Sequence, residues 1–161
     1  MVSMLDDIDK QNKQVDNENN LLEPGAIWND KTTFLDPCCK TGVFLKVIFD
    51  KLDTALQNEE FYGDKYKDNV TRRNHILDNQ LFGLTLDNEQ SLTASRRNVS
   101  GRWDYKNIQY IDNYIVRVVD KDKRTKLKDS IKESLGESMF DVVIGNPPYQ
   151  QKIQRGGAEK I

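Results

Sequence analysis

The stretch FLDPCCKTGVFLKVIFDKLDTALQ, residues 34–57, decides the fold, because it joins a short strand to a helix through a tight loop. Residues 32–36 predict a buried strand that ends at Pro37. After Gly42, apolar residues recur with the period of one helix face, at Phe44, Ile48, Leu52 and Leu56. Asp53 is expected on the opposite, solvent-facing side. Strand, loop and helix in this order predict the opening of a β-α-β unit.

The same alternation continues along the chain. Further apolar strand patterns occupy residues 80–87, 107–111 and 140–145, and helical patterns lie over residues 88–98 and 121–135. Asp87 and Gln90 are interpreted as a capping box that starts the first of these helices. Strands that alternate with helices predict an α/β fold with a doubly wound, mostly parallel sheet. Ligands of such sheets bind beyond the carboxyl ends of the strands, where the strand order reverses.

Composition restricts the partners and the cellular compartment that such a domain is expected to have. Hydrophobic residues make up 37% of the 161 residues and charged residues 31%, and the formal net charge is −2. This charge is a poor match for a protein that binds nucleic acid unaided. The sequence predicts no membrane span and no metal site, and its two adjacent cysteines favour a reducing cytoplasm.

A second unusual loop follows the strand pattern FDVVIG, residues 140–145, and reads Asn146-Pro147-Pro148-Tyr149. The prolines hold the loop extended and remove backbone donors, so it presents acceptor oxygens. Tyr149 adds an aromatic face on which a base can stack. Two acceptors beside a ring suit a planar group with an NH2, such as adenine. The plainer alternative is that Pro-Pro only ends the strand and Tyr149 packs on the surface.

The loop at residues 36–42 also favours the binding of a nucleotide-like ligand. An acid at a strand end, then a loop with glycine, then a helix is a common seat for nucleotide-like ligands. The G-x-G-x-x-G pattern is absent from the sequence, which disfavours a dinucleotide. A loop-ordering role for Asp36 is the alternative.

Together the two loops resemble the restriction-modification amino-methyltransferases that modify adenine N6 in DNA. Leu35 to Leu45, LDPCCKTGVFL, is similar to their first motif, LDPACGSGNFL, and Asn146 to Tyr149 matches their NPPY. The form of the first loop looks especially like the Eco57I-like methylases. The resemblance implies a Rossmann-like class I methyltransferase fold with S-adenosylmethionine as cofactor and a flipped-out adenine in double-stranded DNA as substrate.

The resemblance also implies roles for single residues. Asp36 would contact the methionine part of the cofactor, with Pro37, Cys38 and Gly42 shaping the wall beside it. Thr85 or Asp87 would hold the ribose, and Asp112 the adenine ring. The catalytic loop would be formed by Asn146, Pro147, Pro148 and Tyr149. Two departures weaken the match: Lys40 stands where the family has glycine, and Thr85 stands where it has an acid.

The resemblance further implies a division of the chain. Residues 1–22 are interpreted as a polar N-terminal arm, helical or disordered, and residues 23–161 as a partial catalytic domain. The C-terminal strands and the DNA-reading region of the family are expected to lie elsewhere. A fused or associated endonuclease or helicase is a further expected partner, and so is a second copy joined through the open sheet edge.

Two other functions stay open. NPPY also occurs in enzymes that methylate a glutamine amide, so a protein-glutamine or RNA methyltransferase is one alternative. A non-catalytic remnant or subunit that binds cofactor weakly is the other, favoured by Lys40 and Thr85.

Overall fold

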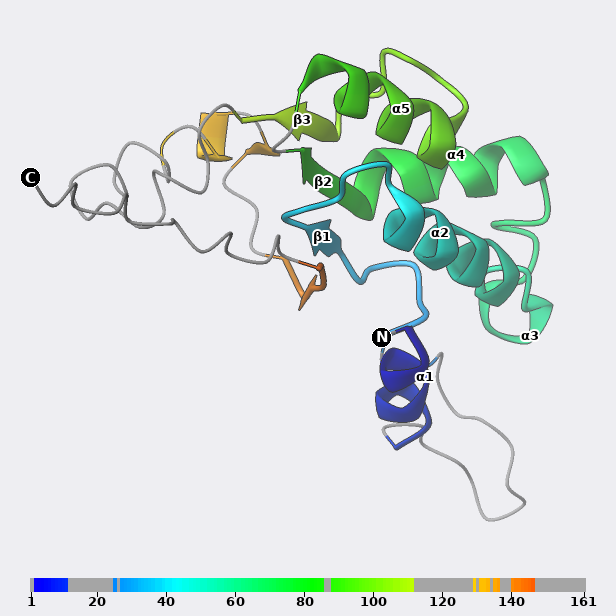
Figure 1. The fold of residues 1–161 in the computed structure, drawn as a ribbon. Coiled ribbons are helices and arrows are strands. Elements are labelled where there is room, and N and C mark those ends of the chain that lie inside the picture. The colour runs from blue at the N-terminus through cyan, green and yellow to red at the C-terminus, as the bar shows by residue number, and fades with distance from the viewer. Residues whose placement is uncertain are drawn as a thin grey trace, which may run out of the picture.

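The computed structural model describes residues 2–11, 25, 27–85, 88–111, 129, 131–133, 135–136 and 140–146. This part of the chain contains both helices and strands (Figure 1). In order they are α1 (Val2–Gln11), β1 (Phe34–Asp36), α2 (Val43–Ala55), α3 (Glu59–Tyr62), α4 (Asn69–Asn79), β2 (Leu81–Thr85), α5 (Glu89–Ser100), β3 (Ile108–Tyr110) and β4 (Val142–Val143).

The four strands form one parallel sheet in the order β3-β2-β1-β4. Phe34 of β1 pairs with Leu81 on one side and with Val142 on the other. The chain therefore builds outward from β1 to β3 and then returns to add β4 on the opposite side of β1. The strand order reverses between β1 and β4, which confirms the predicted α/β, Rossmann-like fold and places its switch point there.

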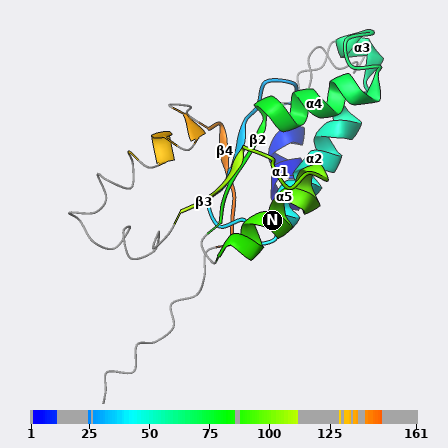
Figure 2. The same ribbon diagram turned by 90° about the horizontal axis from the view of Figure 1, so that it is seen from above.

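Side chains of the sheet pack into two apolar clusters, one on each face. On one face, Phe34, Leu81 and Ile108 pack with the buried side chains of α2. On the other, Leu35 and Leu84 pack with Leu135. Figure 2 shows α1, α2, α4 and α5 on one side of the sheet, and the orange-yellow stretch around residues 131–135 on the other. This two-sided cover explains why the strands read as continuous apolar runs.

Of the predicted apolar stripe, α2 buries Ile48 and Leu52, whereas Phe44 is only half-buried. The helix begins after Gly42, whose φ of 75° lies in the left-handed region that favours glycine. The expectation for Asp53 is wrong. Its side chain is buried, and its carboxylate binds the Nε of Arg72 at 2.7 Å and the Nη2 of Arg73 at 3.1 Å. This partner was not predictable from local sequence, because Arg72 lies in a helix that the apolar pattern did not reveal.

That helix is α4. Only two of its apolar residues, Ile76 and Leu77, are buried, and Arg72 is buried beside them, so no clear apolar stripe is present in the sequence. It begins at Asp68, whose carboxylate accepts a hydrogen bond from the Thr71 backbone N–H. His75, the one histidine of the chain, lies in the last turns of α4 and donates from Nε2 to the Asp30 carbonyl at 2.8 Å.

Helix α5 starts one residue later than predicted. Its N-cap is Asn88, whose side chain accepts a hydrogen bond from the Ser91 backbone N–H, so the capping box of Asp87 and Gln90 is wrong. Asp87 itself lies outside the described residues. Of the helix predicted over residues 121–135, the structure describes residues 129, 131–133 and 135, all helical.

The first part of the polar arm is helix α1, and it is tied to the domain. Leu5 belongs to the main apolar cluster. The carboxylate of Asp9 accepts hydrogen bonds from the backbone N–H groups of Ile27 and Trp28, at 2.8 and 3.2 Å. A buried acid that satisfies two backbone donors fixes α1 more firmly than the composition of residues 1–22 indicates.

Two further expectations concern surfaces. In the described part of the chain β4 pairs only with β1, and Val143 is 63% exposed, so dimerisation through this edge stays a prediction. Among the described residues, no helix has the length and apolar character needed to cross a bilayer.

Candidate functional site at the switch point

The ends of β1 and β4 bring the two predicted loops together. The Ile144 N–H donates to the Leu35 carbonyl at 2.9 Å, so Asp36 and Gly145 lie next to each other. A Cβ at position 145 would come within 2.7 Å of the Asp36 Oδ1, which only glycine avoids. Asn146 follows directly and is exposed. Pro147, Pro148 and Tyr149 lie outside the described residues, and so does Asp112.

Asp36 is an acid without a full set of partners. Its side chain is fully buried, and Oδ1 accepts a hydrogen bond from the Cys38 backbone N–H at 2.9 Å. The second oxygen, Oδ2, has no hydrogen-bond partner. Burial raises the pKa of Asp36 to about 6, although the Cys38 N–H acts in the opposite direction. An underpartnered buried carboxylate in a loop at a switch point is the kind of group that a cationic ligand stabilises.

The loop after Asp36 is held against the sheet by its own backbone. The Cys39 N–H donates to the Leu84 carbonyl at 2.9 Å, and the Gly42 N–H donates to the Cys39 carbonyl. Lys40, inside this turn, has a φ of 44°. The departure from glycine is therefore accommodated by a strained, left-handed lysine.

The two cysteines pack rather than react. Both are free thiols and both are buried. Burial, together with the negative charge of the nearby Asp36, raises the pKa of Cys39 to about 12, so the thiol is not ionised at neutral pH. Within the described ranges, no group of three or more His, Cys, Asp or Glu side chains is arranged to hold a metal ion.

Thr85 ends β2 on the face covered by helices. It is fully buried and its Oγ1 has no hydrogen-bond partner. On the same face, a Cβ at Gly83 would lie 2.8 Å from the Leu45 Cδ1 and 3.0 Å from the Cys39 Sγ, so α2 and the loop approach the strand closely. One enclosed hydroxyl is a weak substitute for a carboxylate as an acceptor of two ribose hydroxyls. Among the described residues, Asp36 thus fits the charged end of S-adenosylmethionine better than Thr85 fits its ribose, and Asp87, the other predicted ribose contact, lies outside them.

Sequence reasoning missed Gly145 and the contribution of α5. The glycine directly before NPPY was a usable signal, because a residue without a side chain is needed where these two strand ends touch. No feature of the sequence marked Asn98 as part of the site. Its side-chain amide donates to the Thr41 carbonyl at 2.9 Å across 57 residues of chain, a contact that only the fold creates.

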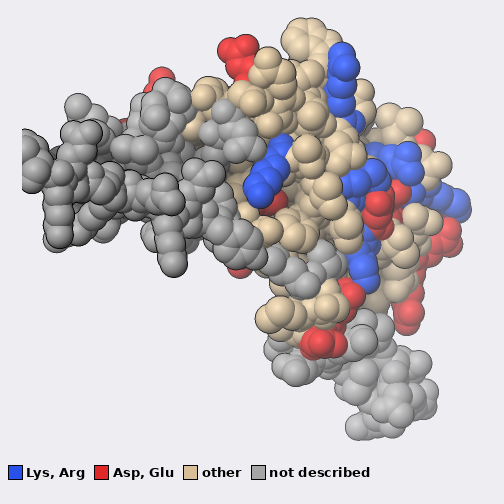
Figure 3. All heavy atoms as spheres, viewed as in Figure 1, with Lys and Arg blue, Asp and Glu red and all other residues tan. Residues whose placement is uncertain are grey.

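Charges around the domain are mixed. On the face shown in Figure 3, Lys and Arg side chains alternate with Asp and Glu over the right-hand part, with uncharged side chains between them. The described residues on this face therefore present no broad basic surface for a phosphate backbone, as the net charge of −2 leads one to expect.

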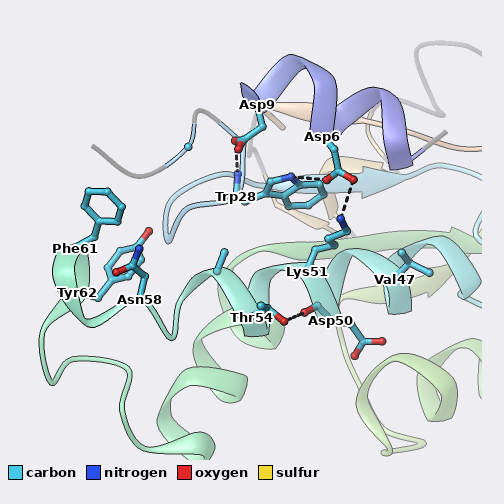
Figure 4. A pocket seen from close by; sticks show the side chains of 12 residues that line it. Asp6, Asp9, Trp28, Val47, Asp50, Lys51, Thr54, Asn58, Phe61 and Tyr62 are labelled. Atoms are coloured by element: carbon cyan, nitrogen blue, oxygen red, sulfur yellow. Dashed lines mark hydrogen bonds and ion pairs between the residues drawn. The ribbon is translucent and has the colours of Figure 1, made fainter. Parts of the chain in front are cut away.

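A separate cavity of about 640 Å³ lies between α1, α2 and α3 (Figure 4). Its acids already have partners: Asp6 accepts from the Trp28 Nε1 at 3.0 Å and binds the Lys51 Nζ at 2.7 Å. The Lys51 contact joins α1 to α2, and the Trp28 contact joins α1 to the segment before β1. No residue of the loops at 36–42 and 140–146 lines this cavity, so it is distinct from the switch point.

Fold and site together define a class: a parallel α/β domain with a buried acid and an exposed asparagine at its switch point is consistent with a Rossmann-like methyltransferase. The family model of the Eco57I restriction-modification methylases matches residues 7–160, and the chain belongs to that family. A search among curated proteins gave no match. The match begins within the polar arm, earlier than the resemblance quoted from the two loops.

Proposed function

We propose that this chain carries the catalytic site of a DNA methyltransferase that transfers a methyl group from S-adenosylmethionine to the N6 of an adenine flipped out of double-stranded DNA. Membership of the restriction-modification methylase family supports the reaction class and a DNA substrate. The observation that carries the finer proposal is the unpartnered Asp36 Oδ2 beside Gly145, one residue before Asn146.

Asp36 would bind the cationic methionine end of the cofactor. Its free oxygen can accept a hydrogen bond from an ammonium group, and a positive charge there would offset the cost of burying the carboxylate. Bound at this position, S-adenosylmethionine supplies a methyl group on a sulfonium, which a nitrogen lone pair can attack. Pro37, Cys38 and Gly42 would form the wall of this site.

Asn146 would orient the target amine. Its side-chain oxygen, with the Pro147 carbonyl, would accept hydrogen bonds from the adenine NH2 and keep the nitrogen lone pair out of conjugation with the ring. Tyr149 would stack on the base, with a contribution of about 1–3 kcal/mol. The rate would come from positioning and from fixed dipoles, with no covalent intermediate on the protein.

The test uses calorimetric titration of S-adenosylmethionine into the wild type, Asp36→Asn and Asn146→Ala. Asp36→Asn is expected to abolish measurable binding, because it removes the carboxylate charge proposed to bind the ligand's cation. Asn146→Ala is expected to bind the cofactor normally but to lose methylation of adenine-containing duplex DNA.

Wild-type protein that does not bind the cofactor would favour the non-catalytic alternative, in which the buried Thr85 hydroxyl leaves the ribose unheld. Binding with methylation of a glutamine-containing peptide or of RNA, and none of DNA, would favour the other alternative.

A further inference from the structure

Helix α5 lies against the outside of the turn that follows Asp36. Asn98 donates from Nδ2 to the Thr41 carbonyl at 2.9 Å. Ser95 and Val99 pack against Gly42 so closely that a Cβ there would come within 2.7 Å of the Val99 Cγ2. Residues three and four apart share one face of a helix, so a single face of α5 contacts the turn.

The turn itself holds a conformation that its sequence does not favour. The Gly42 N–H closes it by donating to the Cys39 carbonyl, and Lys40 is its second residue. Lys40 is the one non-glycine residue with a positive φ in the part of the chain that the structure describes. Turns with a positive φ at this position strongly favour glycine, because a Cβ makes the left-handed region costly. Something other than local preference must therefore stabilise the turn.

We propose that Asn98 is a positioning residue for the methyl donor: by holding the Thr41 carbonyl it keeps the strained turn in place, and with it the loop from Pro37 to Gly42 beside Asp36. This role rests on the proposed function. Asn98 does not touch Asp36; it acts through Thr41, on the strain at Lys40. Without this hydrogen bond, Lys40 is free to relax to a negative φ, and the wall of the cofactor site moves relative to the Asp36 carboxylate.

The strain gives a specific test, because glycine removes it. The experiment is a double-mutant cycle of wild type, Asn98→Ala, Lys40→Gly and the double variant, in the full 161-residue chain. Each protein is titrated with S-adenosylmethionine by calorimetry and unfolded with urea in the absence of ligand. Asn74→Ala is the matched control, since Asn74 is an exposed helical asparagine of α4 whose side chain makes no hydrogen bond in the structure.

Asn98→Ala is expected to weaken cofactor binding about fivefold, the factor that corresponds to the loss of one ordinary hydrogen bond. In the Lys40→Gly background the same change is expected to have less than a twofold effect, because the turn no longer needs support. Likewise, Asn98→Ala should lower the urea midpoint less in the Lys40→Gly background than in the wild-type background. Asn74→Ala is expected to change neither the affinity for the cofactor nor the difference between the wild-type and Lys40→Gly backgrounds.

Equal losses of affinity in both backgrounds would overturn the positioning role, since Asn98 would then act independently of the turn. Unchanged affinity in Asn98→Ala would overturn it as well. Failure of the proposed function looks different: wild-type protein would not bind the cofactor at all, and the positioning role would fall with it.

Discussion

At the scale of single residues, Asp36 combines a proposed ligand contact with an energetic cost. Folding raises the pKa of its carboxyl to about 6, from 3.8 in an exposed setting, mainly through burial. The folded protein therefore holds this proton at pH values where the unfolded chain has lost it. The stability of the ligand-free protein should fall as the pH rises from about 4 to about 6, as far as this group is concerned.

The corresponding prediction is that Asp36→Asn stabilises the ligand-free protein at pH 7.5, by about 1–3 kcal/mol, and has little effect at pH 4. Urea unfolding of both proteins across this pH range measures the difference directly. Asp78→Asn, at an exposed carboxylate, serves as control. A destabilised Asp36→Asn variant at neutral pH would mean that the carboxylate has a stabilising partner in the ligand-free state.

At the scale of elements, the pairing of α2 with α4 depends on one buried carboxylate and two unequal arginines. The side chain of Arg72 is 4% exposed and also donates to the Tyr66 carbonyl and to the Asn69 Oδ1. The side chain of Arg73 is 56% exposed and contacts the same carboxylate from outside. The inner pair is shielded from water, whereas the outer pair is screened.

We therefore expect Asp53→Ala to reduce the free energy of unfolding by about 3–5 kcal/mol, because it leaves the Arg72 guanidinium buried without its counter-charge. Arg73→Ala is expected to cost less than about 1 kcal/mol. Urea denaturation of both variants provides the comparison. Similar losses for the two would show that water reaches the inner pair.

The same elements show how far the sequence predicts this fold. Strands β1 to β4 and helix α2 were predictable because apolar runs and periodic apolar residues are local signals. Helix α4 was not, since its buried face is formed partly by Arg72, whose partner Asp53 lies 19 residues away. The site follows the same rule: Asp36 and Asn146 are marked by loop chemistry, whereas Asn98 is placed by packing alone.

At the scale of the whole molecule, charge limits what the chain can do alone. With a formal net charge of −2 and mixed charges on the face shown in Figure 3, we expect few phosphates to be neutralised. We expect the 161-residue chain to bind duplex DNA no more tightly than about 10⁻⁴ M at physiological salt, with a shallow salt dependence. Fluorescence anisotropy at 50 and 200 mM salt measures both. Micromolar or tighter binding with a steep salt slope would contradict this expectation.

The starts of β1 and β4 are joined by hydrogen bonds between Thr33 and Asp141, and this contact has a consequence for the order of assembly. The Thr33 backbone N–H and hydroxyl both donate to the Asp141 carboxylate across 108 residues, whereas β1, β2 and β3 are joined over shorter stretches of chain. On the ribosome, β1, α2 and α5 emerge well before the strand that carries Asn146, and contacts of long sequence separation form late. A nascent polypeptide interrupted before residue 140 retains Asp36 but lacks the second side of its site, which makes the completed site a late product of translation.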